Sequence, residues 1–225
     1  MERKQFPDLA ELISGKFLRH SRAFYEWRIA DRQKRIEESI GDVRLYDDLA
    51  VAYDKTGQHQ KAIETALKTQ DLSPNRYETL ANLGTFHLHS GDFEAGLEFI
   101  GKAIEINPDA HFGREIYQRL LVEYVLQQRA DGPLPQPLSD EDSAGAFGTR
   151  GFAAFVLKKQ SGGAVASDDD GEIERAIKGV SGMLKFGHHD SPVLLEALAD
   201  LLMAGSINQH RHLAARAWLK ASYFF

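Results

Sequence analysis

The sequence contains no cysteine, so disulfide bonds and thiolate metal sites are both excluded. It also lacks any run close to the ~20 consecutive apolar residues that a membrane-spanning helix requires. Glu2, Asp8, Glu11 and Lys16 are scattered through the start of the chain, which therefore has no apolar core of the secretory-signal type. An exported protein whose signal had been removed would look the same, so the location stays open between cytoplasmic, as the chain stands, and exported.

What the sequence does contain is an internal repeat. Between Tyr46 and Pro108, equivalent residues recur 34 positions apart. The clearest pairs are Leu49 and Leu83, Gly57 and Gly91, and Pro74 and Pro108. A fixed period in this range is typical of a repeat architecture, in which each unit buries its apolar face by stacking on its neighbours.

The period and the residue pattern resemble the tetratricopeptide repeat (TPR), a helix–turn–helix unit of 34 residues. The first unit spans residues 43–76 and the second spans residues 77–110. The matching residues are Tyr46, Leu49, Ala50, Tyr53, Gly57, Ala62, Ala66 and Pro74 in the first unit, and Leu80, Leu83, Gly84, His87, Gly91, Ile100, Ala103 and Pro108 in the second, which has Gly96 where the family has alanine. The resemblance implies helical hairpins, in which small residues let two helices approach and proline ends the second.

Two further units continue this register. Residues 111–190 form a third unit if a long insertion, at about 125–170, interrupts its hairpin. The first helix of that unit is expected from His111 to about Gln127. Residues 191–225 form a TPR-like fourth unit with a lengthened turn. The predicted fold is therefore an all-α, TPR-type solenoid of about four repeats, the third of them split by the insertion.

The insertion differs from the repeats in composition. Residues 131–145 and 161–170 are rich in glycine, proline, serine and aspartate and poor in large apolar groups, so they predict loops. Between them, residues 151–160 predict a short helix that packs on the solenoid through Phe152, Phe155 and Val156. Long insertions are either functional or disordered, and the sequence does not decide between the two.

The N-terminal segment, residues 1–42, precedes the repeats. Residues 1–36 hold nine Lys or Arg against five acidic residues, whereas the whole chain has a net charge of −6. Residues 18–39 predict an amphipathic helix with Phe24, Trp27 and Ile36 facing inward, interpreted as a cap over the open end of the solenoid. The alternative interpretation is a dedicated acidic-docking surface. The overall acidity argues against a nucleic-acid partner.

No motif in the sequence indicates catalysis. Two groups are candidate metal ligands, namely His188, His189 and Asp190 and, further along, His210 and His212. The helix expected between these groups separates them by ~20 Å, too far to share one ion. His87 and His89 lie two residues apart on one helix and so point to different faces. We therefore predict no enzyme activity, no cofactor and no metal site.

The family resemblance implies a binding role. Peptide partners of TPR proteins lie in a concave groove and contact six positions on the first helix of each repeat. Transferred to this chain, these positions are Arg44, Asp47, Asp48, Val51, Asp54 and Lys55 in the first repeat, Glu78, Ala81, Asn82, Thr85, Leu88 and His89 in the second, and Phe112, Glu115, Ile116, Arg119, Val122 and Glu123 in the third. Because several of them are acidic, the expected partner is basic or neutral.

The predicted function is a non-enzymatic scaffold that binds a protein or peptide in this concave groove. TPR proteins that hold chaperone C-termini use Lys and Asn where this chain has Asp47 and Val51, so a co-chaperone role is not expected. The alternative is an oligomerisation or assembly subunit that acts through its exposed ends and insertion. The aromatic C-terminus, Trp218 with Tyr223–Phe225, predicts either a homo-oligomer contact or a longer natural chain.

Overall fold

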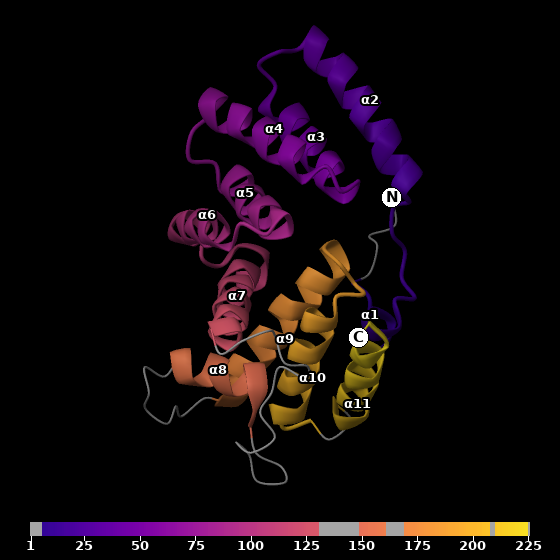
Figure 1. Ribbon diagram of the computed structural model, residues 1–225, viewed down its shortest axis with the longest axis vertical. Helices are drawn as coiled ribbons and strands as arrows, with labels where there is room; N and C mark the ends of the chain where they lie inside the picture. Colours follow the sequence, from indigo (N-terminus) through magenta and orange to yellow (C-terminus); the bar gives the residue numbers. More distant parts are fainter. Residues whose placement is uncertain (1–5, 131–148, 161–168, 208–209, 225) are drawn as a thin grey trace. The chain divides into compact units, whose positions relative to one another are not determined.

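The computed structural model describes residues 6–130, 149–160, 169–207 and 210–224, and every regular element within these ranges is helical (Figure 1). This confirms the predicted all-α helical-repeat fold. The chain forms two compact units: Met1–Phe17 together with Ala110–Phe225 make unit 1, and Leu18–Asp109 make unit 2. None of the helices in the described ranges has both the length and the apolar character needed to cross a bilayer.

Unit 2 is a stack of five helices, each packed against the next in chain order, with α3 also touching α5. The helices are α2 (Arg22–Glu38), α3 (Val43–Lys55), α4 (His59–Leu72), α5 (Tyr77–Ser90) and α6 (Phe93–Ile106). The predicted repeats therefore correspond to the hairpins α3–α4 and α5–α6. Their shared core consists of Leu49, Ala50, Tyr53, Ala62, Ile63, Ala66, Leu83 and Phe86.

The repeated glycines have a backbone role in the turns of both hairpins. Gly57 has φ 81° and Gly91 has φ 89°, the left-handed region that only glycine enters without steric cost. Asp92 follows Gly91 and caps α6 by accepting a hydrogen bond from the Ala95 backbone N–H. Each turn thus ends one helix and begins the next within a few residues, which keeps the period at 34.

Helix α2 matches the predicted N-terminal helix in position but not entirely in orientation. Ile36 packs against the core of unit 2 and Phe24 is partly buried, as expected. Trp27 was expected to face inward, but its exposed fraction is 58%. The partly buried apolar residue on this part of the helix is Ile29, two positions later. The charged residues of α2 therefore contribute more of the contact with α3 than the apolar pattern suggested.

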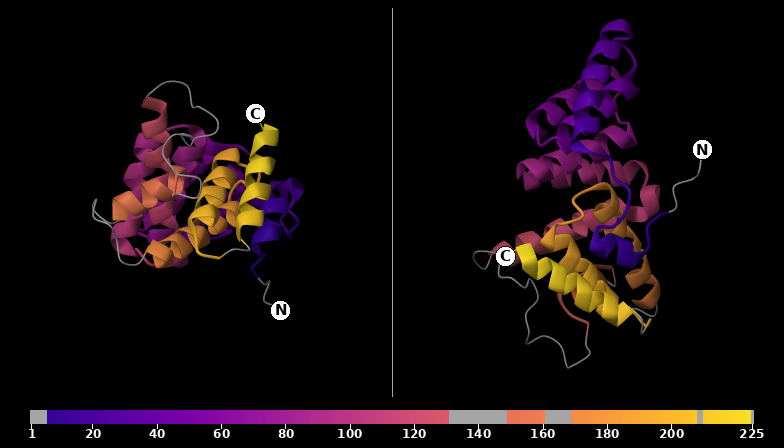
Figure 2. Two further views of the ribbon diagram at one scale, coloured as in Figure 1. Left: turned by 90° about the horizontal axis from the view of Figure 1, so that it is seen from below. Right: turned by 90° about the vertical axis from the view of Figure 1, so that its right-hand side faces the viewer.

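Unit 1 pairs helices from distant parts of the sequence. Its elements are α1 (Leu9–Ser14), η1 (Ala110–Gly113), α7 (Arg114–Ala130), α8 (Gly151–Gln160), α9 (Asp169–Phe186), α10 (Pro192–Ala204), α11 (His210–Ala221) and η3 (Ser222–Phe224). Helix α7 packs against α9, and α10 against α11, which runs alongside it in both views of Figure 2. The Tyr117 hydroxyl of α7 donates a 3.0 Å hydrogen bond to Glu172 of α9.

Helix α8 packs as the sequence predicted. Phe152 and Val156 are fully buried, and Phe155 is partly buried against the same core. Asp200 of α10 fixes the start of α8, because its Oδ2 accepts a 3.0 Å hydrogen bond from the Phe152 backbone N–H. Burial raises the pKa of Asp200 to about 6, and the opposing effects of the Phe152 N–H, Arg150 and Trp218 offset this only in part.

Two features of unit 1 differ from the sequence-based expectation. Helix α7 begins at Arg114, not at His111, because His111 and Phe112 adopt left-handed backbone angles. Helix α1 was not predicted; it contacts α9 and α11 and buries Leu12 and Ile13 in their core. Helix α1 is therefore an additional packing partner of α9 and α11 that the repeat pattern did not reveal.

Part of the predicted insertion lies outside the described residues, since residues 131–148 and 161–168 are not described. The two loop predictions fall mostly there, as does Phe225 of the aromatic C-terminus. Helix α7 stops at Ala130 and α9 starts at Asp169. That the segment between them is an insertion within a third repeat stays a prediction.

Candidate functional site

The first helices of the two repeats, α3 and α5, are tied together by one carboxylate. Thr79 donates its hydroxyl proton to Asp47 Oδ1 at 3.0 Å, and Arg76 Nη1 lies 3.1 Å from Asp47 Oδ2. Burial raises the pKa of Asp47, outweighing Arg76 and Thr79, which lower it. Asp47 was predicted to contact a partner, which stays a prediction; within the chain its carboxylate joins α3 to the start of α5.

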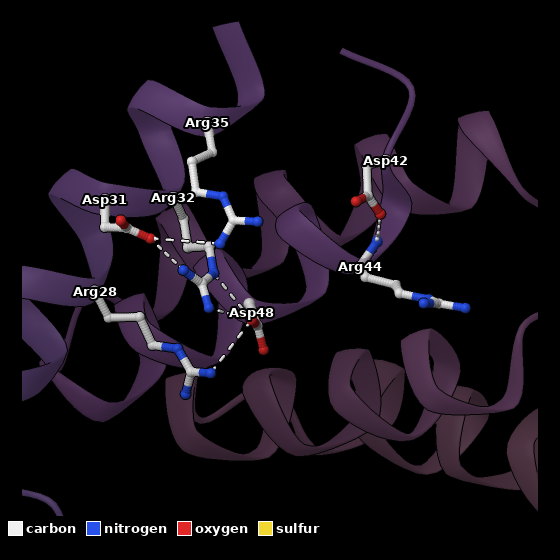
Figure 3. Close-up of polar contacts among 7 residues, drawn as sticks. All are labelled: Arg28, Asp31, Arg32, Arg35, Asp42, Arg44 and Asp48. Carbon is white, nitrogen blue, oxygen red and sulfur yellow. Dashed lines mark hydrogen bonds and ion pairs between the residues drawn. The ribbon is translucent and has the colours of Figure 1, made fainter. Parts of the chain in front are cut away.

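Asp48 contacts the N-terminal helix. Two arginines of α2 converge on its Oδ2, with Arg28 Nη2 at 3.2 Å and Arg32 Nη2 at 2.9 Å (Figure 3). Arg32 also pairs with Asp31 of its own helix. Arg44 lies apart from this cluster in Figure 3, and the aspartate beside it, Asp42, accepts from its backbone N–H rather than its side chain. Asp48 thus already has two partners on α2, although its side chain is still 40% exposed, and its role in partner binding stays a prediction.

The third aspartate of α3 is the most enclosed. Asp54 Oδ1 lies 2.9 Å from His59 Nδ1 and 2.8 Å from His89 Nδ1. Burial favours the neutral carboxyl, but the hydrogen bonds from His89 and His59 and the charge of Lys55 hold the pKa of Asp54 below its usual range. Asp54 is thus an ionised, buried carboxylate between two imidazoles, and not part of an open acidic lining.

The remaining predicted residues of unit 2 differ in exposure. Ala81 is buried, and Leu88 packs over Gly96 between α5 and α6. Thr85 donates its hydroxyl proton to the Ala81 carbonyl oxygen at 3.0 Å and is only partly buried. The predicted residues that remain at least partly exposed, apart from the aspartates and His89, are Arg44, Val51, Lys55, Glu78, Asn82, Thr85 and Leu88. This displayed set carries both charge signs and several neutral side chains.

The residues predicted from the third repeat belong to unit 1. Glu115 is buried and contacts Arg114 at 2.6 Å and His111 at 3.3 Å. Phe112 lies in η1 and its exposed fraction is 76%. Ile116 packs against the core of unit 1, Val122 is partly buried, and Arg119 pairs with Glu123, which also contacts Lys159 of α8. Glu115 therefore does not supply the free negative charge that was expected of it.

The two candidate histidine groups of unit 1 lie near opposite ends of α11. His189 Nε2 contacts Asp190 Oδ2 at 2.8 Å, in a hollow lined by Gly187–Ser191. Lys220, near the end of α11, reaches Asp190 at 2.7 Å, whereas His210 begins that helix. Ten residues of helix correspond to about 15 Å, so the geometry keeps the two groups apart.

Sequence reasoning missed the convergence of Asp54, His59 and His89, the one group of potential metal ligands that the described part of the chain brings together. His87 and His89 do point apart, since His87 contacts Asp92 and His89 contacts Asp54. The signal was present in the repeat register. Asp54 and His89 occupy neighbouring positions on the first helices of successive repeats, and such helices lie side by side.

Comparison with protein-family models matches two segments of the chain. Residues 43–76 and residues 77–110 each match the model described as tetratricopeptide repeat. These are the same two spans that the 34-residue period delimits, and they coincide with the hairpins α3–α4 and α5–α6.

Proposed function

Because this chain is a tetratricopeptide-repeat protein, with repeats at residues 43–76 and 77–110, we propose that it binds a protein or peptide partner across the displayed side chains of α3 and α5. Repeats of this family are typical of protein–protein interaction scaffolds and generally carry no catalytic machinery. A scaffold needs a surface of fixed spacing, and repeat stacking supplies one.

The observation that supports this surface most directly is the Asp47 tie between α3 and α5. Because Thr79 and Arg76 both hold Asp47, the displayed residues of the two helices keep a fixed separation. A partner that bridges the helices would not have to order them first, which lowers the entropic cost of binding. Val51 and Thr85, equivalent positions of the two repeats, are the neutral side chains at the middle of this set.

We infer that the partner is recognised mainly through neutral contacts. Asp47, Asp48 and Asp54 all have cationic or imidazole partners within the chain, which offsets much of their negative field. Arg44 and Glu78, the exposed charged residues at equivalent positions, have opposite signs. Of the basic and neutral partners that the sequence allowed, the neutral one fits this arrangement better.

The proposal can be tested by affinity purification from the source organism. A partner retained by the wild-type protein should be lost with Val51→Arg and Thr85→Arg. Leu67→Arg, on the exposed side of α4, is the matched control and should retain it. The purified pair should then bind with little dependence on salt concentration. Retention by the Val51 and Thr85 variants, or loss with the Leu67 control, would argue against this surface.

A second candidate function, assembly through the C-terminal end, is favoured by a separate observation. Tyr223 has an exposed fraction of 71%, and Phe224 of 48%. Adjacent exposed aromatic residues at the end of a helix are common in contacts between protein molecules. We propose this role as an alternative that does not require the α3–α5 surface.

A further inference from the structure

Three helix ends of unit 2 converge on one carboxylate oxygen. Asp54 lies in the last turn of α3, His59 is the first residue of α4, and His89 is the penultimate residue of α5. One potential ligand atom from each side chain lies within 4.8 Å of the other two. The two imidazole rings approach edge to face, with centroids 5.6 Å apart.

The cluster is enclosed on one side and open on the other. The Asp54 side chain is 3% exposed, whereas the His59 and His89 side chains are 27% and 21% exposed. The carboxylate is therefore shielded from solvent, whereas both imidazole rings are partly accessible to it.

We propose that Asp54, His59 and His89 bind a single divalent transition-metal ion, with Zn²⁺ as the ion that fits them best. Two imidazole nitrogens and one carboxylate oxygen are common zinc ligands, and a water molecule would complete a tetrahedron. Two ligands each ~2.1 Å from a tetrahedral metal lie roughly 3.4 Å apart. The observed nitrogen–oxygen distances of 2.8 and 2.9 Å would have to open by about half an ångström.

The surrounding backbone favours a cation on balance. Helices α3 and α5 both direct their carbonyl ends toward the cluster, and the C-terminal end of a helix carries partial negative charge. Helix α4 opposes them with its N-terminal end at His59. Lys55 lies next to Asp54 and also repels a cation, so the three ligands must supply most of the affinity.

Metal binding would rearrange the protons of the cluster. A carboxylate oxygen can only accept, so in the hydrogen-bonded cluster both Nδ1 atoms carry a proton. Each Nδ1 must lose that proton to bind the ion, either to Nε2 of the same ring or to solvent. Because the ion competes with protons for these nitrogens, affinity for the metal is expected to fall as the pH is lowered.

The site goes beyond the proposed partner-binding role, because it would join both helices of the first repeat to the first helix of the second. An ion held by all three ligands would stabilise the repeat pair against unfolding, by an amount set by the ion concentration and its dissociation constant. The proposed metal site does not rest on the partner surface at Val51 and Thr85.

Zinc titration of the full-length protein without a histidine tag tests the proposal. A chromophoric chelator competes for the ion and reports one bound Zn²⁺ per chain, and Co²⁺ in its place should give the visible absorption of a tetrahedral site. We expect His59→Ala, His89→Ala and Asp54→Asn each to weaken Zn²⁺ binding at least tenfold. Added Zn²⁺ should raise the melting temperature of the wild-type protein but not that of these variants.

Two histidine variants serve as matched controls. His87→Ala removes an imidazole two residues from His89 that contacts Asp92, and His188→Ala removes one in unit 1. Both should bind Zn²⁺ as the wild type does. If His89→Ala loses helical circular dichroism, His89→Gln replaces it. The proposal is overturned if the wild type binds no Zn²⁺ at micromolar concentrations, if the ligand variants bind as well as the wild type, or if either control variant weakens binding equally.

Discussion

Gly84 and Gly96 face each other across the α5–α6 hairpin so closely that neither position has room for a side chain. A Cβ atom on Gly84 would lie 2.5 Å from Ile100 Cγ1 and 3.1 Å from the Gly96 carbonyl oxygen. A Cβ atom on Gly96 would lie 2.5 Å from Leu88 Cδ2 and 3.2 Å from the Gly84 carbonyl oxygen. The second repeat has glycine in place of the family's alanine at Gly96, and the two helices use the space so released.

The first prediction concerns this contact. Gly84→Leu should overpack the hairpin and lower the free energy of unfolding by about 1–3 kcal/mol. Gly101→Ala on α6 is the matched control, because a Cβ atom there meets nothing within 4 Å. That change should leave stability unchanged or raise it by up to about 1 kcal/mol, since alanine favours helix. Urea denaturation measures both, and an unchanged midpoint for Gly84→Leu would mean that the helices do not cross there.

A second prediction follows from Asp200. Its folded-state pKa of about 6 exceeds the ordinary value, so the folded state binds this proton more tightly than the unfolded state. The stability that this contributes is complete below pH ~4 and is lost as the pH rises through about 6. Two pKa units correspond to about 3 kcal/mol at most.

Asp200→Asn should remove this dependence while keeping an acceptor for the Phe152 N–H. The unfolding free energy of the wild type minus that of the variant should therefore fall between about pH 4 and about pH 6 and level off above about pH 7. Asp71→Asn, at an exposed position of α4, supplies the matched comparison and should show no such change. If this difference in unfolding free energy rose with pH instead, the folded state would not bind the Asp200 proton more tightly than the unfolded state does.

A third prediction separates the capping role of α2 from a docking role. Asp48→Ala removes the acceptor shared by Arg28 and Arg32, so α2 should exchange its amide hydrogens faster while α6 is unaffected. The loss should be below about 1 kcal/mol, because the pair is partly exposed and screened by solvent. Asp71→Ala is the control. If α2 exchange is unchanged, the arginines do not hold the helix and are better explained as a surface for another molecule.

The fourth prediction concerns the exposed aromatic residues of η3. If they form a contact between copies, the wild type should sediment as a larger species at high concentration, and Tyr223→Ser with Phe224→Ser should remain monomeric. Trp27→Ser is the control, since Trp27 is also exposed but lies on α2. A wild type that stays monomeric at every concentration would eliminate the assembly role.

The sequence predicted the helical hairpins well because their requirements are local and recur. Gly57 and Gly91 mark turns that need positive φ, and Phe152 with Val156 marks a buried face within one short helix. Trp27 was assigned wrongly because aromatic size is a poor guide where charged residues make the contact. The Asp48 pairs with Arg28 and Arg32 are formed between helices, and no spacing rule within α2 reveals them.

The candidate site was harder to predict than the fold. Family positions indicate which residues lie on the first helices, but not which of them already have partners. Asp47, Asp54 and Glu115 counted equally as acidic lining, yet Asp47 and Asp54 each contact a residue that only the folded chain brings near. Glu115 is buried and contacts its sequence neighbour Arg114. The His59 and His89 contacts show the same limit, because they combine one local neighbour of Asp54 with one residue from the next repeat.

The packing of α1 has a consequence for the order of events during synthesis. Unit 1 contains Met1–Phe17 and resumes at Ala110, so α1 leaves the ribosome long before α9 and α11, the helices that cover Leu12 and Ile13. At ~5–20 residues per second, that delay lasts roughly 10–40 s. Helices α2–α6 have their packing partners within Leu18–Asp109 and can fold in the meantime. Arrested nascent chains of increasing length, probed by proteolysis, should therefore show unit 2 protected first, with α1 left accessible to chaperones until Ala221 has emerged.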